Sequence, residues 1–337
     1  MEQSYFRNKV TFLNVLLTIM IVVLHAKSPE RFGLLVEDYP IIYCISMLCR
    51  VATPLFFFLS ALLFYKGCCF NDLERKYKSR IDSLLIPYLL WNIIFVAIFW
   101  VLSHVPILSS KMNMGAILSN PKDILIAILD SHHTDLWFVK DLMAYTILAP
   151  VLLLFFKNKK TSFILLSIVL AIAIYLQPAY KSLLRWLPIY MIGAAFGYYW
   201  NDLTIDRFVR ARHRNLYTVI ALVMLITAYL LALYKNTDIY LIYISPILIW
   251  FIVDGLFYKL IQDFRVKKWM SYMFFVFCTH HFVLNVLQKI VVLCFDPTPL
   301  VITLTYFLSP ILCVFFLIKS ADLISHYKVY KILSGGR

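Results

Sequence analysis

The chain has 337 residues, of which 62% are hydrophobic and 15% are charged. A soluble domain has about 25% charged residues, so the composition excludes an ordinary soluble protein and indicates a membrane protein. The formal net charge of +14 would suit a nucleic-acid-binding protein. The basic residues nevertheless fall mainly in connections between apolar segments, and we therefore expect no nucleic acid as a partner.

A helix that crosses a bilayer needs about 20 mostly apolar residues. Hydropathy predicts about ten such helices, and hence an all-α polytopic fold that forms a single membrane domain over residues 1–337. Helix packing through small residues should be a minor theme, since the chain has only 8 glycines. In chain order the predicted spans are Val10–Ala26, Ile41–Tyr65, Ile81–Leu102, Leu136–Phe156, Ser162–Leu176, Leu184–Trp200, Leu216–Tyr234, Ile239–Phe257, Trp269–Phe295 and Leu300–Lys319.

Lysine and arginine residues are concentrated in alternate connections between these spans. With both termini in the cytoplasm, most of the 32 basic residues fall on the inner side, as the positive-inside rule requires. The pattern predicts a multi-pass protein of the inner or plasma membrane, in contact with membrane lipids. One outer connection, at about 103–135, is long, and a short cytoplasmic tail, at about 320–337, follows the last span.

The first predicted span carries two polar residues, Asn14 and His25, eleven positions apart. Eleven residues make about three helical turns and about 16 Å of rise, so both side chains lie on one face. A histidine inside a helix bundle can act as a general base, because its ordinary pKa is about 6.5. The alternative is an interfacial histidine that only meets water or headgroups. Leu24 fits a cleavage site at Ala26 poorly, and we expect the span to be retained.

Arg50 lies in the middle of the second predicted span, Ile41–Tyr65. A guanidinium stays protonated, and a charge at the bilayer centre costs from about 2.5 to more than 10 kcal/mol, depending on how it is measured. Such a residue needs a partner, a water-filled cavity or a ligand. We therefore predict a polar chamber around Arg50 inside the helix bundle.

A basic cluster that includes Arg75, Lys78 and Arg80 precedes the third predicted span on the expected cytoplasmic side. Guanidinium and ammonium groups in such a position can bind the phosphates of a nucleotide-like cofactor. The alternative is ordinary positive-inside charge that contacts lipid headgroups. The residue types alone leave both interpretations open.

Two later segments place polar residues inside spans. Leu136-Trp137-Phe138 opens the fourth span and precedes Lys140 and Asp141, which diverge by about 100° on a helix and need separate partners. His280 and His281 are adjacent in the ninth span, so they cannot both face one cavity. We expect no metal site, because helical ligand pairs sit three or four residues apart. The sequence also contains no Gly-x-Ser-x-Gly nucleophile elbow.

Taken in order, these segments resemble the integral-membrane acyltransferase 3 family over nearly the whole chain. The resemblance implies about ten helices and transfer of an acyl group, commonly acetyl, from cytoplasmic acyl-coenzyme A to a hydroxyl of a sugar or glycan, free or lipid-linked. Bacterial members often modify surface polysaccharides. The similar segments are a first span ending in His25, then Arg50–Ser60, Arg80–Trp91, Leu136-Trp137-Phe138 and a late span with His280.

The resemblance also implies roles for individual residues. His25 would accept the proton of the acceptor hydroxyl, Arg50 or a nearby tyrosine would stabilise the oxyanion, and His280 would bind the acceptor or orient His25. Asn14 stands where the family has an arginine in the first helix, so the chain departs from the family pattern there. Acyl-coenzyme A would be held at the cytoplasmic face by Arg75, Lys78, Arg80 and Asn14.

A second interpretation is a transporter or flippase for a lipid-linked sugar or a small anion. Intramembrane charges and histidines also suit a translocation path. Two features weigh against this interpretation. The sequence shows no inverted repeat, and it has no pair of Gly- or Pro-broken segments at matching positions.

Overall fold

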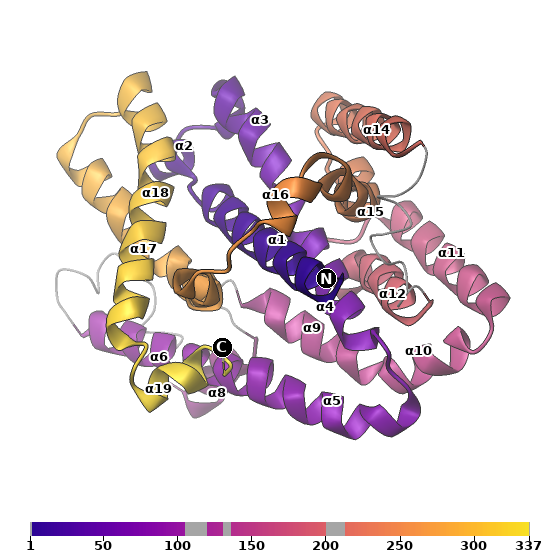
Figure 1. Ribbon diagram of the computed structural model, residues 1–337. Coiled ribbons are helices and arrows are strands. Elements are labelled where there is room, and N and C mark those ends of the chain that lie inside the picture. The colour runs from indigo at the N-terminus through magenta and orange to yellow at the C-terminus, as the bar shows by residue number, and fades with distance from the viewer. Residues whose placement is uncertain (1, 105–119, 131–135, 200–212, 337) are drawn as a thin grey trace.

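The computed structural model describes residues 2–104, 120–130, 136–199 and 213–336 (Figure 1). These residues form helices joined by short connections, and no strand occurs among them. The all-α prediction is therefore confirmed. Length and composition also allow most of the long helices to cross a membrane, as the hydropathy predicted.

Each of the ten predicted spans coincides with one or two observed helices. Within the described ranges, eight segments are long and apolar enough to cross a membrane, and the bent pair α9–α10 makes a ninth. The tenth, α12, has 17 residues and is shorter than these eight. The helices concerned are α1 (Glu2–Leu24), α3 (Pro40–Cys49), α4 (Ala52–Tyr65), α6 (Ile86–Ser103), α9 (Trp137–Ile147), α10 (Ala149–Phe156), α11 (Lys159–Leu176), α12 (Leu183–Tyr199), α14 (Arg214–Lys235), α15 (Ile239–Leu256), α17 (Met273–Cys294) and α18 (Pro299–Ile324).

Short helices occupy several of the connections. The helix α8 lies within the predicted outer connection at 103–135, whose stretches 105–119 and 131–135 fall outside the described residues. The predicted tail is also helical, since α18 extends to Ile324 and α19 packs against α6. The short elements are α2 (Ser28–Arg31), η1 (Val36–Asp38), η2 (Phe70–Asp72), α5 (Leu73–Arg80), the π-helical turn η3 (Ile81–Leu85), α8 (Pro121–Asp130), α16 (Tyr258–Gln262), η4 (Lys268–Tyr272) and α19 (Lys328–Leu333).

Prolines accompany two breaks within predicted spans. Pro54 has no N–H and cannot donate to the carbonyl of Arg50, four residues earlier, and the second span is divided between α3 and α4 at Arg50 and Val51. Pro150, in the first turn of α10, follows the 53° bend that separates α9 from α10. Arg50 therefore lies at a junction between two helices and not in the middle of one.

The first helix lies inside the bundle. α1 runs through the middle of Figure 1 and contacts α3, α4, α16, α17 and α18. Leu13 and Leu17 on α1 are fully buried, so much of the surface of this helix is covered by other parts of the protein. A helix with neighbours on several sides can pack with some faces and line an internal space with another.

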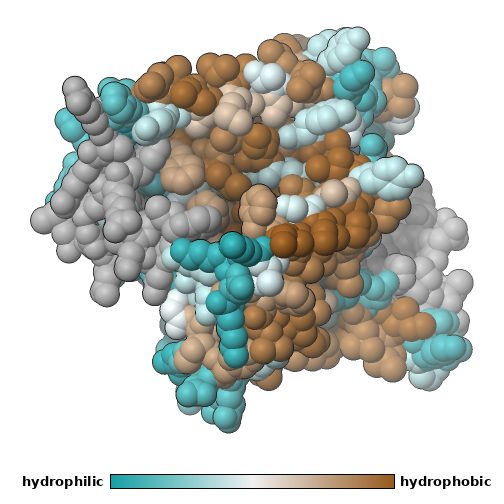
Figure 2. Space-filling model, turned by 90° about the vertical axis from the view of Figure 1, so that its right-hand side faces the viewer, coloured by the Kyte–Doolittle hydropathy of each residue, from teal (hydrophilic) through white to brown (hydrophobic). Residues whose placement is uncertain are grey.

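The outer helices expose apolar side chains. α11 and α14 lie at the right of Figure 1, and Figure 2 shows that side of the molecule, where hydrophobic residues cover most of the visible surface. Phe163 and Ile168 on α11 and Leu216 and Val223 on α14 are all more than half exposed. Apolar patches of this extent suit contact with lipid chains.

Small residues set one close helix contact. A Cβ atom at Gly193 would overlap the backbone carbonyl of Phe58, and one at Gly197 would overlap that of Leu62. The two glycines, four residues apart on α12, therefore let its backbone approach α4. Small-residue packing therefore matters at this interface, although the low glycine content predicts that it is a minor theme over the chain as a whole.

A buried ion pair joins the first helix to α15. Nζ of Lys9 lies 2.7 Å from Oδ2 of Asp254 and 2.8 Å from the carbonyl oxygen of Trp250. Tyr5 donates its hydroxyl to the other carboxylate oxygen of Asp254 at 2.9 Å. Lys9 and Asp254 are 0% and 1% exposed, so the pair is shielded from water. This satisfied network fixes the α1–α15 contact.

Candidate functional site

One face of α1 lines a series of three cavities. The residues on this face are Thr11, Asn14, Thr18, Ile21 and His25, at spacings of three or four. Such spacings keep side chains on one stripe of a helix. From Thr11 to His25 the helix rises by about 21 Å. The sequence-based expectation that Asn14 and His25 share a face agrees with this stripe.

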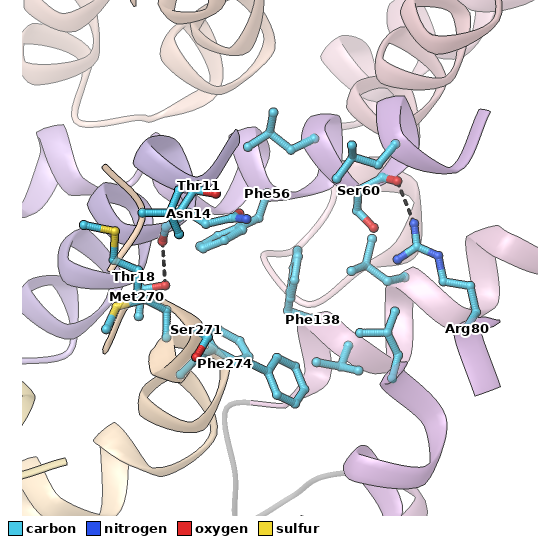
Figure 3. Close-up of a pocket in the computed structure, with 18 residues that line it drawn as sticks. Thr11, Asn14, Thr18, Phe56, Ser60, Arg80, Phe138, Met270, Ser271 and Phe274 are labelled. Atoms are coloured by element: carbon cyan, nitrogen blue, oxygen red, sulfur yellow. Dashed lines mark hydrogen bonds between the residues drawn. The ribbon is translucent and has the colours of Figure 1, made fainter. Parts of the chain in front are cut away.

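The first cavity, here called the Arg80 cavity, has a volume of about 440 Å³. Figure 3 shows Arg80 on one side, with Thr11, Asn14 and Thr18 on the opposite side. Nη2 of Arg80 donates to the carbonyl oxygen of Ser60 at 2.8 Å, which fixes the guanidinium against α4. Of the residues that line this cavity in the described structure, only Arg80 is charged.

The backbone around Arg80 is irregular. Arg80 ends α5, and the π-helical turn η3 follows directly and carries Leu84 into the cavity wall. π-helical turns are rare and occur often at functional sites. This local distortion and the bond to Ser60 together position the Arg80 guanidinium.

The second cavity, here called the Arg50 cavity, has a volume of about 770 Å³ and contains both Arg50 and His25. Nη1 of Arg50 lies 3.7 Å from Oδ2 of Asp238, and its side chain is 38% exposed. Arg185 holds the other oxygen of Asp238 by a direct hydrogen bond. A second ion pair in the wall joins Lys27 to a glutamate. Positive and negative side chains are thus combined in one polar chamber.

A small central cavity of about 30 Å³ lies between these two. It shares His25 and Tyr180 with the Arg50 cavity, and it shares Phe56, Phe138 and Phe277 with the Arg80 cavity. The hydroxyl of Tyr180 lies 3.3 Å from that of Thr53. The three cavities therefore follow one another along the stripe of α1, and His25 stands where the last two meet.

Hydrogen bonds define which nitrogen of His25 is basic. Nδ1 lies 2.8 Å from the carbonyl oxygen of Ile21, and a carbonyl can only accept, so Nδ1 carries the proton and Nε2 the lone pair. The same argument puts the proton of His280 on Nδ1, 2.7 Å from the carbonyl of Phe277. Nε2 of His280 lies 3.4 Å from Nδ1 of His25, so it can accept only the longer branch of the N–H that His25 donates to Ile21.

His280 can therefore orient the imidazole of His25. It is 1% exposed, whereas the neighbouring His281 is only partly buried. The ring of His281 still lies near His25, with ring centres 5.6 Å apart. Among the described residues, no group of three histidine, cysteine or acidic side chains is arranged to hold a metal ion.

The structure brings some predicted site residues together and leaves others apart. His25 and Arg50 line the Arg50 cavity and His280 contacts His25 from outside its lining, while Asn14 and Arg80 face the Arg80 cavity. Arg75 pairs with Asp72 at 2.7 Å on the surface, and Lys78 is exposed. Neither Arg75 nor Lys78 lines either cavity.

Several residues of the site carried no signal in the sequence. Asp238, Arg185 and Tyr180 come from connections or helix ends, and only the fold places them beside Arg50. Phe277 is one of many aromatic residues in apolar spans. Lys140, by contrast, pairs with Asp130 on α8 and lines none of the three cavities.

Comparison with known families gives one match. A family model described as an acyltransferase domain, that of the acyltransferase 3 family, matches residues 8–319. The matched range covers nearly the whole chain and contains every residue of the three cavities. Neither the search of curated proteins nor the search of solved structures found a match.

Proposed function

Since the chain belongs to the acyltransferase 3 family and is a membrane acyltransferase, we propose that it moves an acyl group from cytoplasmic acyl-coenzyme A to a hydroxyl of a sugar or cell-surface polysaccharide. One observation carries the proposal. Two cavities open at different levels of α1, and a single histidine stands between the central cavity and the larger chamber. Such an arrangement suits two substrates that approach from opposite sides.

The donor side is the Arg80 cavity. The positive-inside pattern puts the start of α1 and the basic cluster at the cytoplasmic face of the inner or plasma membrane. Arg80 offers a guanidinium for a phosphate of coenzyme A, and Asn14 and Thr11 offer neutral hydrogen-bonding groups opposite to it. Arg75 and Lys78, outside the cavity, would attract the anionic donor without holding its arm.

The acceptor side is the Arg50 cavity. Its walls combine paired charges with tyrosines, and this combination suits a neutral polyol better than an apolar ligand. Nε of Arg185 and the hydroxyl of Tyr306 are buried and have no hydrogen-bond partner in the part of the chain that the structure describes. Both atoms belong to residues of the cavity wall. Because both atoms are buried, they do not face the cavity directly, and an acceptor hydroxyl or ring oxygen would reach them only after the wall rearranges.

The reaction uses His25 as the general base. Its Nε2 takes the proton of the acceptor hydroxyl as that oxygen attacks the thioester carbonyl, and Arg50 or Tyr180 stabilises the oxyanion. The new C–O bond forms and the C–S bond breaks. The proton then passes from the imidazolium to the departing thiolate, so the products are an ester and free coenzyme A.

Titration calorimetry with acetyl-coenzyme A tests the donor site. We expect saturable binding to the detergent-purified protein. The affinity of Arg80→Ala should be lower by about tenfold or more, because a charged hydrogen bond contributes roughly 1.5–3 kcal/mol. Lys78→Ala is the matched control, since this basic residue lies two positions away and outside the cavity. Equal losses in both variants would refute a specific site at Arg80.

A transport assay separates the rival interpretation. The two larger cavities at different levels of α1 would also suit a path for a lipid-linked sugar, provided that the narrow space between them widens. Proteoliposomes that move such a sugar without consuming acyl-coenzyme A would favour a transporter. Acyl transfer that disappears in folded His25→Ala would favour the enzyme.

A further inference from the structure

Three phenylalanines form the wall between the Arg80 cavity and the central cavity. Phe56 comes from α4, Phe138 from α9 and Phe277 from α17. Their ring centres are 5.8, 5.9 and 6.2 Å apart, so each ring contacts the other two. Rings at these separations are in van der Waals contact and leave no open bore between them. We call this triangle the phenylalanine collar.

The space behind the collar is small. The central cavity of about 30 Å³ is bounded on the far side by His25 and Tyr180, and laterally by Ile21, Thr53 and Trp137. A cavity needs roughly 10–15 Å³ to hold one water, so this one has room for about two. Beyond it lies the Arg50 cavity, where the charged groups of Arg50, Arg185 and Asp238 stand among apolar side chains such as Leu24 and Ile42.

We propose that the phenylalanine collar seals the donor cavity from the acceptor chamber and, with the central cavity, restricts the transferred acyl group to the shortest chains. The inference rests on the proposed function, since it assumes a donor that enters from the Arg80 cavity. A thioester carbonyl at His25 puts its acyl chain in the central cavity. Two carbons fit there, whereas a longer chain must either displace Ile21, Thr53 or Trp137 or extend past His25 into the space of the acceptor.

The seal follows from the same geometry. A constriction made only of apolar rings excludes water and ions by dewetting. Because the three rings contact one another, the donor arm must turn at least one ring aside to pass. A path that opens only around its substrate lets two aqueous chambers face each other across a membrane without a leak.

Phe277→Ala removes one side of the collar, and Phe275→Ala is the matched control. Phe275 lies on the same helix and packs on Trp91 and Tyr330, away from all three cavities. In the wild type and in Phe275→Ala, we expect kcat/KM for butyryl-coenzyme A to be at least about 100-fold below that for acetyl-coenzyme A. The butyryl chain is two methylenes longer, and each methylene should cost about tenfold or more. In Phe277→Ala we expect the preference for acetyl- over butyryl-coenzyme A, measured as the ratio of the two kcat/KM values, to fall by about tenfold or more.

A second variant and a second assay separate the two roles. Ile21→Ala enlarges the central cavity but keeps the collar and the backbone carbonyl that binds His25, so it should relax chain-length preference without a leak. Proteoliposomes loaded with a pH-sensitive dye should lose a proton gradient faster with Phe277→Ala than with the wild type, Ile21→Ala or Phe275→Ala.

An unchanged chain-length preference in folded Phe277→Ala and Ile21→Ala overturns the length filter, and an unchanged rate of gradient loss in Phe277→Ala overturns the seal. A wild type that transfers no acyl group refutes the proposed function, and the proton-leak assay then still decides the seal.

Discussion

Separating the buried pair Lys9–Asp254 should cost far more than replacing both partners. Lys9 is fully buried, and its ammonium has the carboxylate at 2.7 Å, the Trp250 carbonyl at 2.8 Å and the Trp250 ring below it. Asp254→Asn leaves that ammonium without a counter-charge, and Lys9→Met leaves the carboxylate with only the Tyr5 hydroxyl. Breaking a buried pair in this way destabilises a protein by about 3–5 kcal/mol.

The double variant Lys9→Met/Asp254→Asn removes both charges. The amide oxygen can still accept from Tyr5, and the methionine fills most of the lysine volume. We therefore expect the double variant to lose at least about 2 kcal/mol less free energy of unfolding than the two single variants lose together. Thermal unfolding in detergent can be followed with a thiol-reactive dye, because the chain has buried cysteine side chains, among them Cys49 and Cys68. Additive losses, or single variants within about 0.5 kcal/mol of the wild type, would refute the reasoning.

Three further predictions concern packing and the site. Gly193→Ala should lower the unfolding temperature more than Gly255→Ala, because the first methyl meets the backbone of Phe58 and the second only the side chain of Thr218. Asp238→Asn should reduce kcat about tenfold or more by releasing Arg50, with stability checked by the same unfolding assay. His280→Ala should lower kcat and leave acyl-coenzyme A binding by calorimetry unchanged, whereas equal loss of both would show a structural role.

The spans could be predicted from the sequence because the bilayer imposes a length and an apolar composition on each of them. All ten predicted ranges contain helices. The break at Arg50 was also within reach, since Pro54 stands four residues later and cannot complete the helical hydrogen bond. The helix α8 was not, because its ten residues are too few to register as a span.

The site was predictable only where one helix carries it. Asn14 and His25 share a face because helical periodicity fixes that relation within α1. Asp238 joins Arg50 from a distant part of the chain, and Asp254 joins Lys9 across 245 positions. No periodicity relates such residues, so pairing them needs the tertiary structure. The phenylalanine collar also combines three helices and could not be recognised among 27 phenylalanines.

Arg50 shows how the cost of burying a charge is met. The fold places it at a helix junction, so its guanidinium faces a cavity of about 770 Å³ and the carboxylate of Asp238. Asp238 divides its two oxygens between Arg50 and Arg185, but only Arg185 is in direct hydrogen-bond contact and largely buried, at 11% exposed. Arg50, at 3.7 Å from the carboxylate and 38% exposed, is the cation that can turn toward a developing oxyanion. Arg185 therefore anchors Asp238, and Asp238 holds Arg50 within reach of the reaction that we propose at His25.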